Sequence, residues 1–301
     1  MILSIASQIE QNKTKTWLIM AFFCIFIATV SFVLGKASGL GISWAGSALL
    51  ISSIFSLGSY FFADKLILTL SGAHEADKIK DGSLYTIVEK VTKLAKMPMP
   101  KVYITEDLAP NAFATGRDPQ HAAVCATRGL LEKLNNEEQE AVIAHEISHV
   151  QNYDTRVMAI VAVLVGMIVF LSDWFMRMLW FGGNRRDRED RSGSGGVFML
   201  AGIILAMLSP IAATLIQLAI SRRREYLADA SGALLTHRPN DLALALEKIS
   251  NDKNVLHGAT NATAHLYIAN PFKGKEHKSW FTGLFNTHPP IEERIKILRS
   301  M

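Results

Sequence analysis

Residues 140–149 have the sequence Glu-Ala-Val-Ile-Ala-His-Glu-Ile-Ser-His, within a stretch of helical pattern. On a helix, positions i and i+4 lie on one face, so His145 and His149 can direct both imidazoles at a common metal ion. Glu146 follows His145 directly, where it can take a proton from a metal-bound water without being a ligand itself. The arrangement is typical of zinc peptidases, and it needs a third protein ligand from elsewhere in the chain.

The residues around this motif also favour a helix. Asn135 and Asn136 are N-cap candidates, and glutamates follow in the first turns, where the helix dipole favours acids. An apolar face is supplied by Ala141, Val142, Ala144, Ile147 and Val150. The alternative is a pair of surface histidines beside a glutamate on an ordinary helix, and the rest of the chain argues against it.

Composition indicates a membrane protein. The 301 residues are 50% hydrophobic with a formal net charge of +4, and the apolar residues are concentrated in blocks. Cys24 and Cys125 both lie in apolar surroundings, so no disulfide framework is expected. The basic residues lack the aromatic interleaving of a nucleic-acid surface, so we expect no nucleic-acid partner.

Two uncharged apolar blocks, residues 17–34 and 42–62, lie near the start of the chain. Each is long enough to cross a hydrocarbon core of about 30 Å as a helix. A cleaved signal peptide is the alternative for the first block, but its apolar region would be shorter and no second block would follow at once. We expect residues 1–63 to form a transmembrane helical hairpin. By the positive-inside rule, its ends are placed in the cytoplasm by Lys13, Lys15, Lys65, Lys78 and Lys80.

Residues 64–156 are soluble in character and form the first part of the predicted cytoplasmic metallopeptidase domain. Helical spacing covers residues 76–96, and strands are predicted at 101–105 and 122–127. Residues 111–116 between them suggest a strand that runs into a glycine turn, although their first asparagine fits an ordinary turn equally well. A small sheet beside the motif helix would offer an extended peptide an edge to pair with.

Apolar character returns over residues 157–220, which we expect to form a second hydrophobic helical pair around a mobile loop at 181–196. Residues 157–171 are uncharged but short for a membrane span, whereas 197–220 are long and interrupted only by a Ser-Pro kink. If both halves cross, the arginines of the loop lie outside, against the positive-inside tendency. The halves could instead dip into the bilayer or pack without crossing, and the sequence leaves both topologies open.

An acidic motif follows the last apolar block directly, in residues 221–230, Ser-Arg-Arg-Arg-Glu-Tyr-Leu-Ala-Asp-Ala. Glu225 and Asp229 are at i and i+4 and therefore share a helical face. A glutamate ligand here would complete a zinc site with two histidines, one glutamate and a water. Asp229 could then accept the free N–H of a ligand histidine. The alternative is a solvated, charged helix at the point where the chain leaves the membrane. It would explain the three arginines well and the two acidic residues less well.

Four motifs resemble those of the HtpX family, membrane-bound heat-shock zinc metallopeptidases related to the CAAX prenyl proteases. They are His145-Glu-Ile-Ser-His149-Val-Gln-Asn-Tyr-Asp154, Asn111-Ala-Phe-Ala, Ser221-Arg-Arg-Arg-Glu225-Tyr-Leu-Ala-Asp229 and Thr287-His288-Pro-Pro. The resemblance covers essentially the whole chain. It implies an α+β integral membrane protein, mostly helical, with transmembrane helices and a gluzincin-like zinc metallopeptidase domain that has a small β-sheet. Residues 221–301 would form the C-terminal part of that domain.

The resemblance also implies roles for individual residues in the metal site. One Zn²⁺ ion per chain would be bound by His145, His149 and Glu225. Glu146 would serve as general base and acid, and Asp229 resembles the partner of a ligand histidine.

Outside this centre, Asn111 and Ala112 resemble part of the substrate-binding edge of the family. His288 resembles the family histidine near the C-terminus that can approach the oxyanion. Asp154 matches the family pattern too, and a structural role at the end of a helix is as good an interpretation as a catalytic one.

The activity implied by the resemblance is zinc-dependent endopeptidase cleavage of misfolded or damaged membrane proteins, in quality control and stress response. The protein would lie in the cell inner membrane as a multi-pass protein with its active site facing the cytoplasm. Its partners would be protein substrates and the lipid bilayer. Substrate identity, cleavage specificity and oligomeric state are not specified by the sequence.

Two alternatives share parts of this pattern. A CAAX-type prenyl protease has the same site, but those relatives use more membrane spans than this chain has room for. A non-catalytic membrane scaffold with a structural zinc would need a fourth protein ligand in place of Glu146. Candidates for such a ligand are isolated in the sequence and expected at the surface: His74, His121 and His257.

Overall fold

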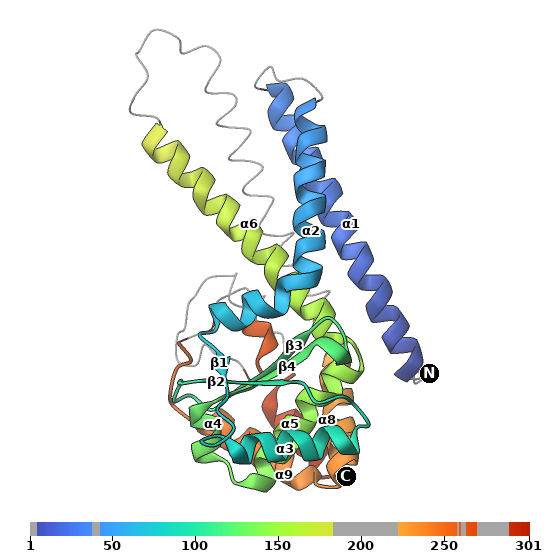
Figure 1. The fold of residues 1–301 in the computed structure, drawn as a ribbon, viewed down its shortest axis with the longest axis vertical. Helices are drawn as coiled ribbons and strands as arrows, with labels where there is room; N and C mark the ends of the chain where they lie inside the picture. The colour runs from blue at the N-terminus through green and yellow to red at the C-terminus, as the bar shows by residue number, and fades with distance from the viewer. Residues whose placement is uncertain (1–4, 38–42, 183–221, 258, 260–262, 270–288) are drawn as a thin grey trace.

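The structure, a computed structural model, describes residues 5–37, 43–182, 222–257, 259, 263–269 and 289–301. Within these ranges, three long helices project from a globular domain that holds a small sheet and shorter helices (Figure 1). The described part is mostly helical with one small sheet, as predicted. The predicted loop beyond residue 182 and the apolar block at 197–220 lie outside the described residues.

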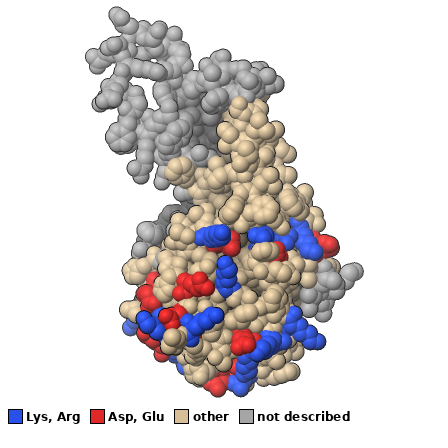
Figure 2. Space-filling view, in the orientation of Figure 1, with Lys and Arg blue, Asp and Glu red and all other residues tan. Residues whose placement is uncertain are grey.

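The first two helices, α1 (Ile5–Ala37) and α2 (Ser43–Leu70), lie side by side (Figure 1). Both are longer than their apolar blocks, since α1 begins well before residue 17 and α2 continues past residue 62. Ile9–Phe32 and Gly46–Leu70 are long and apolar enough to cross a membrane by length and composition. Only 28% and 22% of their most apolar windows are buried, whereas the core helix of a soluble protein would be mostly buried. Figure 2 shows Lys, Arg, Asp and Glu gathered on the globular domain, while the described part of the projecting helices is uncharged on that face.

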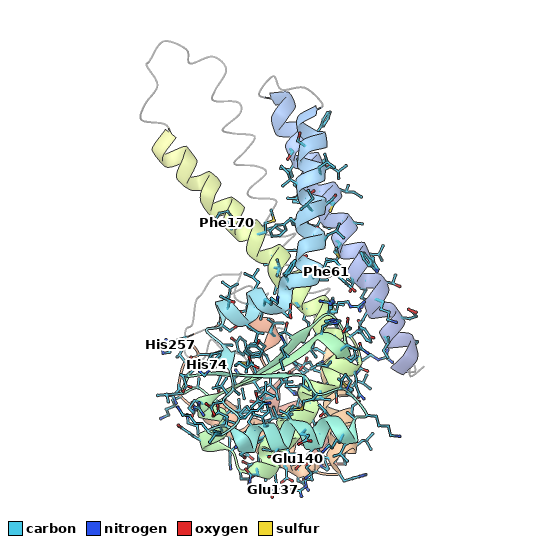
Figure 3. All side chains as sticks on the ribbon, in the orientation of Figure 1. Phe61, His74, Glu137, Glu140, Phe170 and His257 are labelled. Carbon is cyan, nitrogen blue, oxygen red and sulfur yellow. The ribbon has the colours of Figure 1, made fainter. Side chains whose placement is uncertain are left out.

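The third projecting helix, α6 (Asp154–Gly182), has 29 residues, so the block expected at 157–171 is part of a longer helix. In its first half, Val157, Val161 and Leu164 are buried against Ile19 and Phe23 of α1. Figure 3 labels Phe61 where α2 reaches the domain and Phe170 farther out on α6. The three helices therefore form one packed arm.

Four strands form the sheet in the order β1-β2-β4-β3. The pair β2–β4 is parallel, and the pairs β1–β2 and β3–β4 are antiparallel. The strands are β1 (His74–Glu75), β2 (Lys101–Thr105), β3 (Ala112–Gly116) and β4 (Ala122–Thr127). The bounds predicted for β2 and β4 are confirmed. The glycine turn is confirmed at Gly116, where φ is +129° and a Cβ would lie 2.3 Å from His121 O.

Helix α3 (Gly82–Leu94) begins later than predicted from the helical spacing of residues 76–96. The Ala76 N–H donates to Val102 O, so the chain is still tied to the sheet there. Asp77 Oδ1 then accepts backbone N–H groups two and three residues on, at 2.8 and 3.0 Å. This side-chain turn competes with a helix and delays its start.

Helix α5 (Asn136–Gln151) carries the His-Glu-x-x-His motif. Asn135 is its N-cap, as predicted, within a capping box: its side chain accepts the Glu138 N–H at 2.8 Å, and Glu138 Oε2 accepts the Asn135 N–H at 3.0 Å. Glu137 marks the start of α5 at the end of the domain far from the arm (Figure 3). The histidines of the last turns therefore lie toward the arm.

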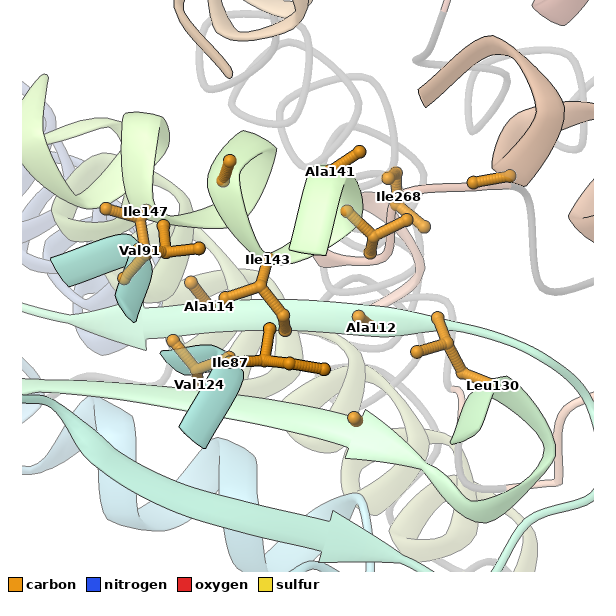
Figure 4. Close-up of a cluster of buried hydrophobic side chains, with 14 of the residues drawn as sticks. Ile87, Val91, Ala112, Ala114, Val124, Leu130, Ala141, Ile143, Ile147 and Ile268 are labelled. Atoms are coloured by element: carbon orange, nitrogen blue, oxygen red, sulfur yellow. The ribbon is translucent and has the colours of Figure 1, made fainter. Parts of the chain in front are cut away.

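The core of the domain lies between α5, the sheet and α3 (Figure 4). Ile143 and Ile147 of α5 are fully buried there, in the same cluster as Ala112 and Ala114 of the edge strand β3. The small β3 side chains let the helix pack closely on the strand. The motif is thereby held next to the sheet edge.

The remaining helices complete the domain around α5. They are α4 (Arg128–Lys133), α8 (Arg222–Thr236), α9 (Pro239–Asn251) and α11 (Ile291–Leu298). At Gly232 of α8, a Cβ would lie 3.0 Å from His145 N and 3.2 Å from Ala144 C. Glycine therefore permits the close approach of α8 to α5 that brings the acidic motif to the histidines.

We expect Asn135→Ala to lower the free energy of unfolding by about 1 kcal/mol, because the first turn of α5 loses its side-chain acceptor. Denaturant unfolding of the detergent-solubilised, metal-free protein measures the change. Asn136→Ala is the matched control, since Asn136 is exposed and is not the cap. Equal losses in the two variants would contradict the capping assignment.

Candidate metal centre

The structure brings His145 and His149 of α5 together with Glu225 of α8. One ligand atom from each lies within 4.8 Å of the other two, and all three residues are buried. The two Nε2 atoms are 3.2 Å apart, and His149 Nε2 lies 3.5 Å from Glu225 Oε1. Residues far apart in the sequence thus direct three donor atoms at one position.

These distances fit a single small metal ion. Zinc bonds of about 2.0–2.1 Å in tetrahedral geometry put neighbouring donors about 3.3 Å apart. The separations of 3.2 and 3.5 Å agree with this value, and that of 3.9 Å between His145 Nε2 and Glu225 Oε2 is slightly longer. Among the described residues, the group has only these three members. Three protein ligands leave one position for water, as in catalytic zinc sites.

Each histidine has a carboxylate beside its other ring nitrogen. His149 Nδ1 lies 3.0 Å from Asp154 Oδ2. His145 Nδ1 lies 2.9 Å from Asp229 Oδ1, a close contact that falls short of the alignment of a full hydrogen bond. Carboxylates in these places hold the protons on Nδ1 and leave both Nε2 lone pairs for a metal.

Buried charge around the centre also favours a divalent cation. Arg294, fully buried, binds Asp229 through Nε and Nη2 at 2.8 and 2.6 Å. Arg224 Nη1 lies 3.3 Å from Asp154 Oδ1. These two guanidinium groups face four buried carboxylates, so with neutral histidines two negative charges remain among Glu146, Asp154, Glu225, Asp229, Arg224 and Arg294. A bound M²⁺ ion would balance them.

The pKa values of the ionisable side chains in this centre are shifted by burial and by their charged neighbours. Burial raises the pKa of Glu146 to about 8. Burial alone would lower the pKa of His149, but the carboxylates around it, Asp154 first, raise it to about 9. Burial would raise the pKa of Asp229, but Arg294 and His145 hold it at about 2. Both Glu146 and His149 therefore favour their protonated forms more than the free side chains do.

Glu146 lies beside the three ligands and is 2% exposed. The backbone N–H of Ala114 in β3 lowers the pKa of this carboxylate and so opposes the effect of burial. The glutamate is therefore held between the metal ligands and the sheet edge.

Asn111 and Ala112, which the sequence predicted at the substrate-binding edge, form hydrogen bonds with another segment of the protein. Asn111 is 3% exposed, and its Nδ2 donates to Ala269 O at 3.2 Å. The carbonyl of Ala112 accepts the Ile268 N–H at 3.1 Å. The Asn111 side chain thus holds the segment at residues 263–269 and does not face an open edge. His288 lies outside the described residues.

The sequence did not predict that Asp154 is the hydrogen-bond partner of His149, and it gave no functional role to Arg294. The signal for Asp154 was its place five residues after His149, just past the end of the helix. Arg294 has no local signal, because it lies in the last helix, 65 residues from Asp229. The isolated histidines at positions 74, 121 and 257 are exposed, as predicted, and two of them are labelled in Figure 3.

A helical His-Glu-x-x-His motif that meets a distant glutamate at one buried position defines a metallopeptidase centre. The chain belongs to peptidase family M48, whose family model matches residues 78–301. Within that family it is an HtpX-type protease, which confirms the resemblance found in the sequence.

Relatives named "Protease HtpX homolog" match nearly the full length of the chain. The one from Caldanaerobacter subterraneus is 43% identical over 97% of this chain and 96% of its own. The one from Streptococcus pneumoniae is 45% identical over 98% of this chain and 99% of its own. The crystal structure of S. mikatae Ste24p aligns over 95% of this chain and 67% of its own, with 17% identity and a TM-score of 0.49, too distant to bear on the activity.

Proposed function

We propose that the protein is a membrane-anchored zinc endopeptidase. The observation that carries this proposal is the convergence of His145, His149 and Glu225, with Glu146 beside them. Zinc bound there would supply Lewis acidity, which lowers the pKa of a bound water and polarises the scissile carbonyl.

The residues around the metal would then do the proton transfer and the positioning. Glu146 takes the proton of the attacking water and delivers it to the leaving amine. The Ala114 N–H favours its ionised form, which is the form that takes a proton. Asp154 and Asp229 keep the ligand histidines in the tautomer that presents Nε2. His288 would stabilise the oxyanion, a role that rests on its motif alone.

We further propose that a substrate pairs as an extended strand with the outer edge of β3 at Ala114. This edge is opposite the β4 partner in the sheet order. The carbonyl of Ala112 is already bound to Ile268, and that of Gly116 to Thr155 Oγ1 at 3.0 Å. The carbonyl between them, on Ala114, would accept a substrate N–H.

The centre would lie close to the cytoplasmic face of the cell inner membrane. The last ligand of α5 is only a few residues from the start of α6, and both ends of the α1–α2 hairpin lie at the domain. Cations lie over aromatic rings at this junction, as expected at a headgroup region: Lys65 over Phe62, Arg117 over Phe61 and Arg156 over Tyr60. Misfolded or damaged membrane proteins with segments exposed there would be the substrates, which gives the enzyme a role in quality control.

The test is cleavage of an unfolded model protein by the full-length protein in detergent. We expect a chelator to abolish cleavage, added zinc to restore it, and the active protein to hold about one zinc ion per chain. Full activity in the chelator, from a preparation free of metal, would overturn the proposal.

We expect Glu225→Ala to weaken zinc binding by more than the roughly 10–100-fold that partners outside the ligand set contribute. The reason is that only two protein donors would remain. Competition with a chelator of known affinity measures the dissociation constant. Glu292→Ala changes an exposed glutamate of α11 and is the matched control. Equal zinc affinity in both variants would exclude Glu225 as a ligand.

A further inference from the structure

One face of the polar start of α1 is buried against the catalytic domain. Asn12 is 2% exposed and Thr16 0%, whereas Gln11 and Thr14 on the same helix are exposed. A buried amide is costly unless it is hydrogen-bonded. The partners of Asn12 therefore indicate why a polar residue lies at this place in an anchor helix.

Asn12 contacts the end of the motif helix and the residue beside the metal ligand. Its Nδ2 lies 2.8 Å from Asn152 O and 2.8 Å from Asp154 Oδ1, so it donates to both. Its Oδ1 accepts from Arg224 Nη1 at 3.4 Å. These contacts join α1 to α5, α6 and α8, across separations of up to 212 residues.

Asp154 uses its two oxygens for different purposes. Oδ1 lies 2.8 Å from the Asn12 amide and 3.3 Å from Arg224, and Oδ2 lies 3.0 Å from His149 Nδ1. Once Oδ1 is held, the plane of the carboxylate is fixed, and Oδ2 faces the imidazole. Held by Arg224 alone, at the longer distance, the carboxylate could turn away from His149.

We propose that Asn12 is a positioning residue of the metal centre, which orients the Asp154 carboxylate so that His149 presents Nε2 to the metal. This inference rests on the proposed zinc site. It makes the start of α1 part of the catalytic unit as well as part of the membrane anchor. Displacing this helix from the domain would weaken the centre without touching a ligand.

The test compares zinc dissociation constants of the full-length protein in detergent, measured by chelator competition. Asn12→Leu removes the amide at similar volume, and we expect the dissociation constant to rise about 10–100-fold, as for other residues that orient metal ligands. Gln11→Leu places the same side chain at the exposed neighbouring position and is expected to change it less than about twofold.

A second comparison separates positioning from packing. In an Asp154→Ala background, Asn12→Leu is expected to leave zinc affinity unchanged, because the group that Asn12 orients is gone. Equal weakening with and without Asp154, or no weakening at all, would overturn the proposal. Thermal unfolding of the metal-free variants reports any general loss of fold, and Asn12→Ser replaces Asn12→Leu if that variant does not fold.

The same measurements distinguish this inference from the proposed function. If the wild type binds zinc but cleaves nothing, the peptidase proposal fails, and the affinities still decide the role of Asn12. If the wild type cleaves and Asn12→Leu binds zinc as tightly, only the role of Asn12 fails. A wild type that binds no zinc refutes both.

Discussion

Glu146→Gln is expected to reduce peptide-bond cleavage by about 10²–10⁴-fold, the usual contribution of a general base. Glutamine has the shape of glutamate and keeps an oxygen that can accept the Ala114 N–H, but it cannot take a proton from water. The ligands His145, His149 and Glu225 are unchanged, so zinc binding is expected to persist. Turnover of an unfolded model protein and metal content per chain measure the two effects separately.

Glu137→Gln is the matched control for this variant. Glu137 belongs to the same helix, is exposed, and lies 3.8 Å from Arg238 Nη1. We expect its turnover to match the wild type. Retained activity in Glu146→Gln would exclude Glu146 as the general base, and with it the proposed hydrolytic mechanism. Loss of zinc from Glu146→Gln would instead show that Glu146 supports the metal site.

Arg294→Leu is expected to lower the free energy of unfolding by about 3–5 kcal/mol, the cost of removing one partner of a buried ion pair. Arg294 is 0% exposed and holds both oxygens of Asp229. It also donates to Ile268 O at 3.0 Å, in the segment that lies against β3. Its loss would leave the Asp229 carboxylate buried without its counter-ion, next to His145.

Arg299→Leu, at the C-cap of the same helix, provides the comparison. Arg299 pairs with Glu247 at 2.7 Å, but the two side chains are 51% and 45% exposed. Exposed pairs contribute about 0–1 kcal/mol, so this substitution should change stability little. Denaturant unfolding of both metal-free variants in detergent gives the difference. Similar losses in the two would contradict the assignment of Arg294 as the buried counter-ion.

The two histidines of the candidate metal site show what can be predicted from a local sequence pattern. His145 and His149 are placed by helical spacing, and the capping asparagine and the apolar face made that helix predictable. Strands β2 and β4 were predictable in the same way, from short apolar runs. The start of α3 was not, because a backbone bond to the sheet and the Asp77 turn override its helical spacing.

The sequence by itself determined the two long apolar helices, the motif helix, most of the sheet and the family, and it singled out Glu225 as the candidate third ligand. These depend on periodicity and on residues close together in the chain. Only the tertiary structure decided that Arg294 neutralises Asp229 and that Asn12 contacts Asp154 beside His149. Those pairs are separated by as many as 142 residues. Their contacts depend on how helices pack, here on the close approach at Gly232, and such packing has no signature in any single stretch of sequence.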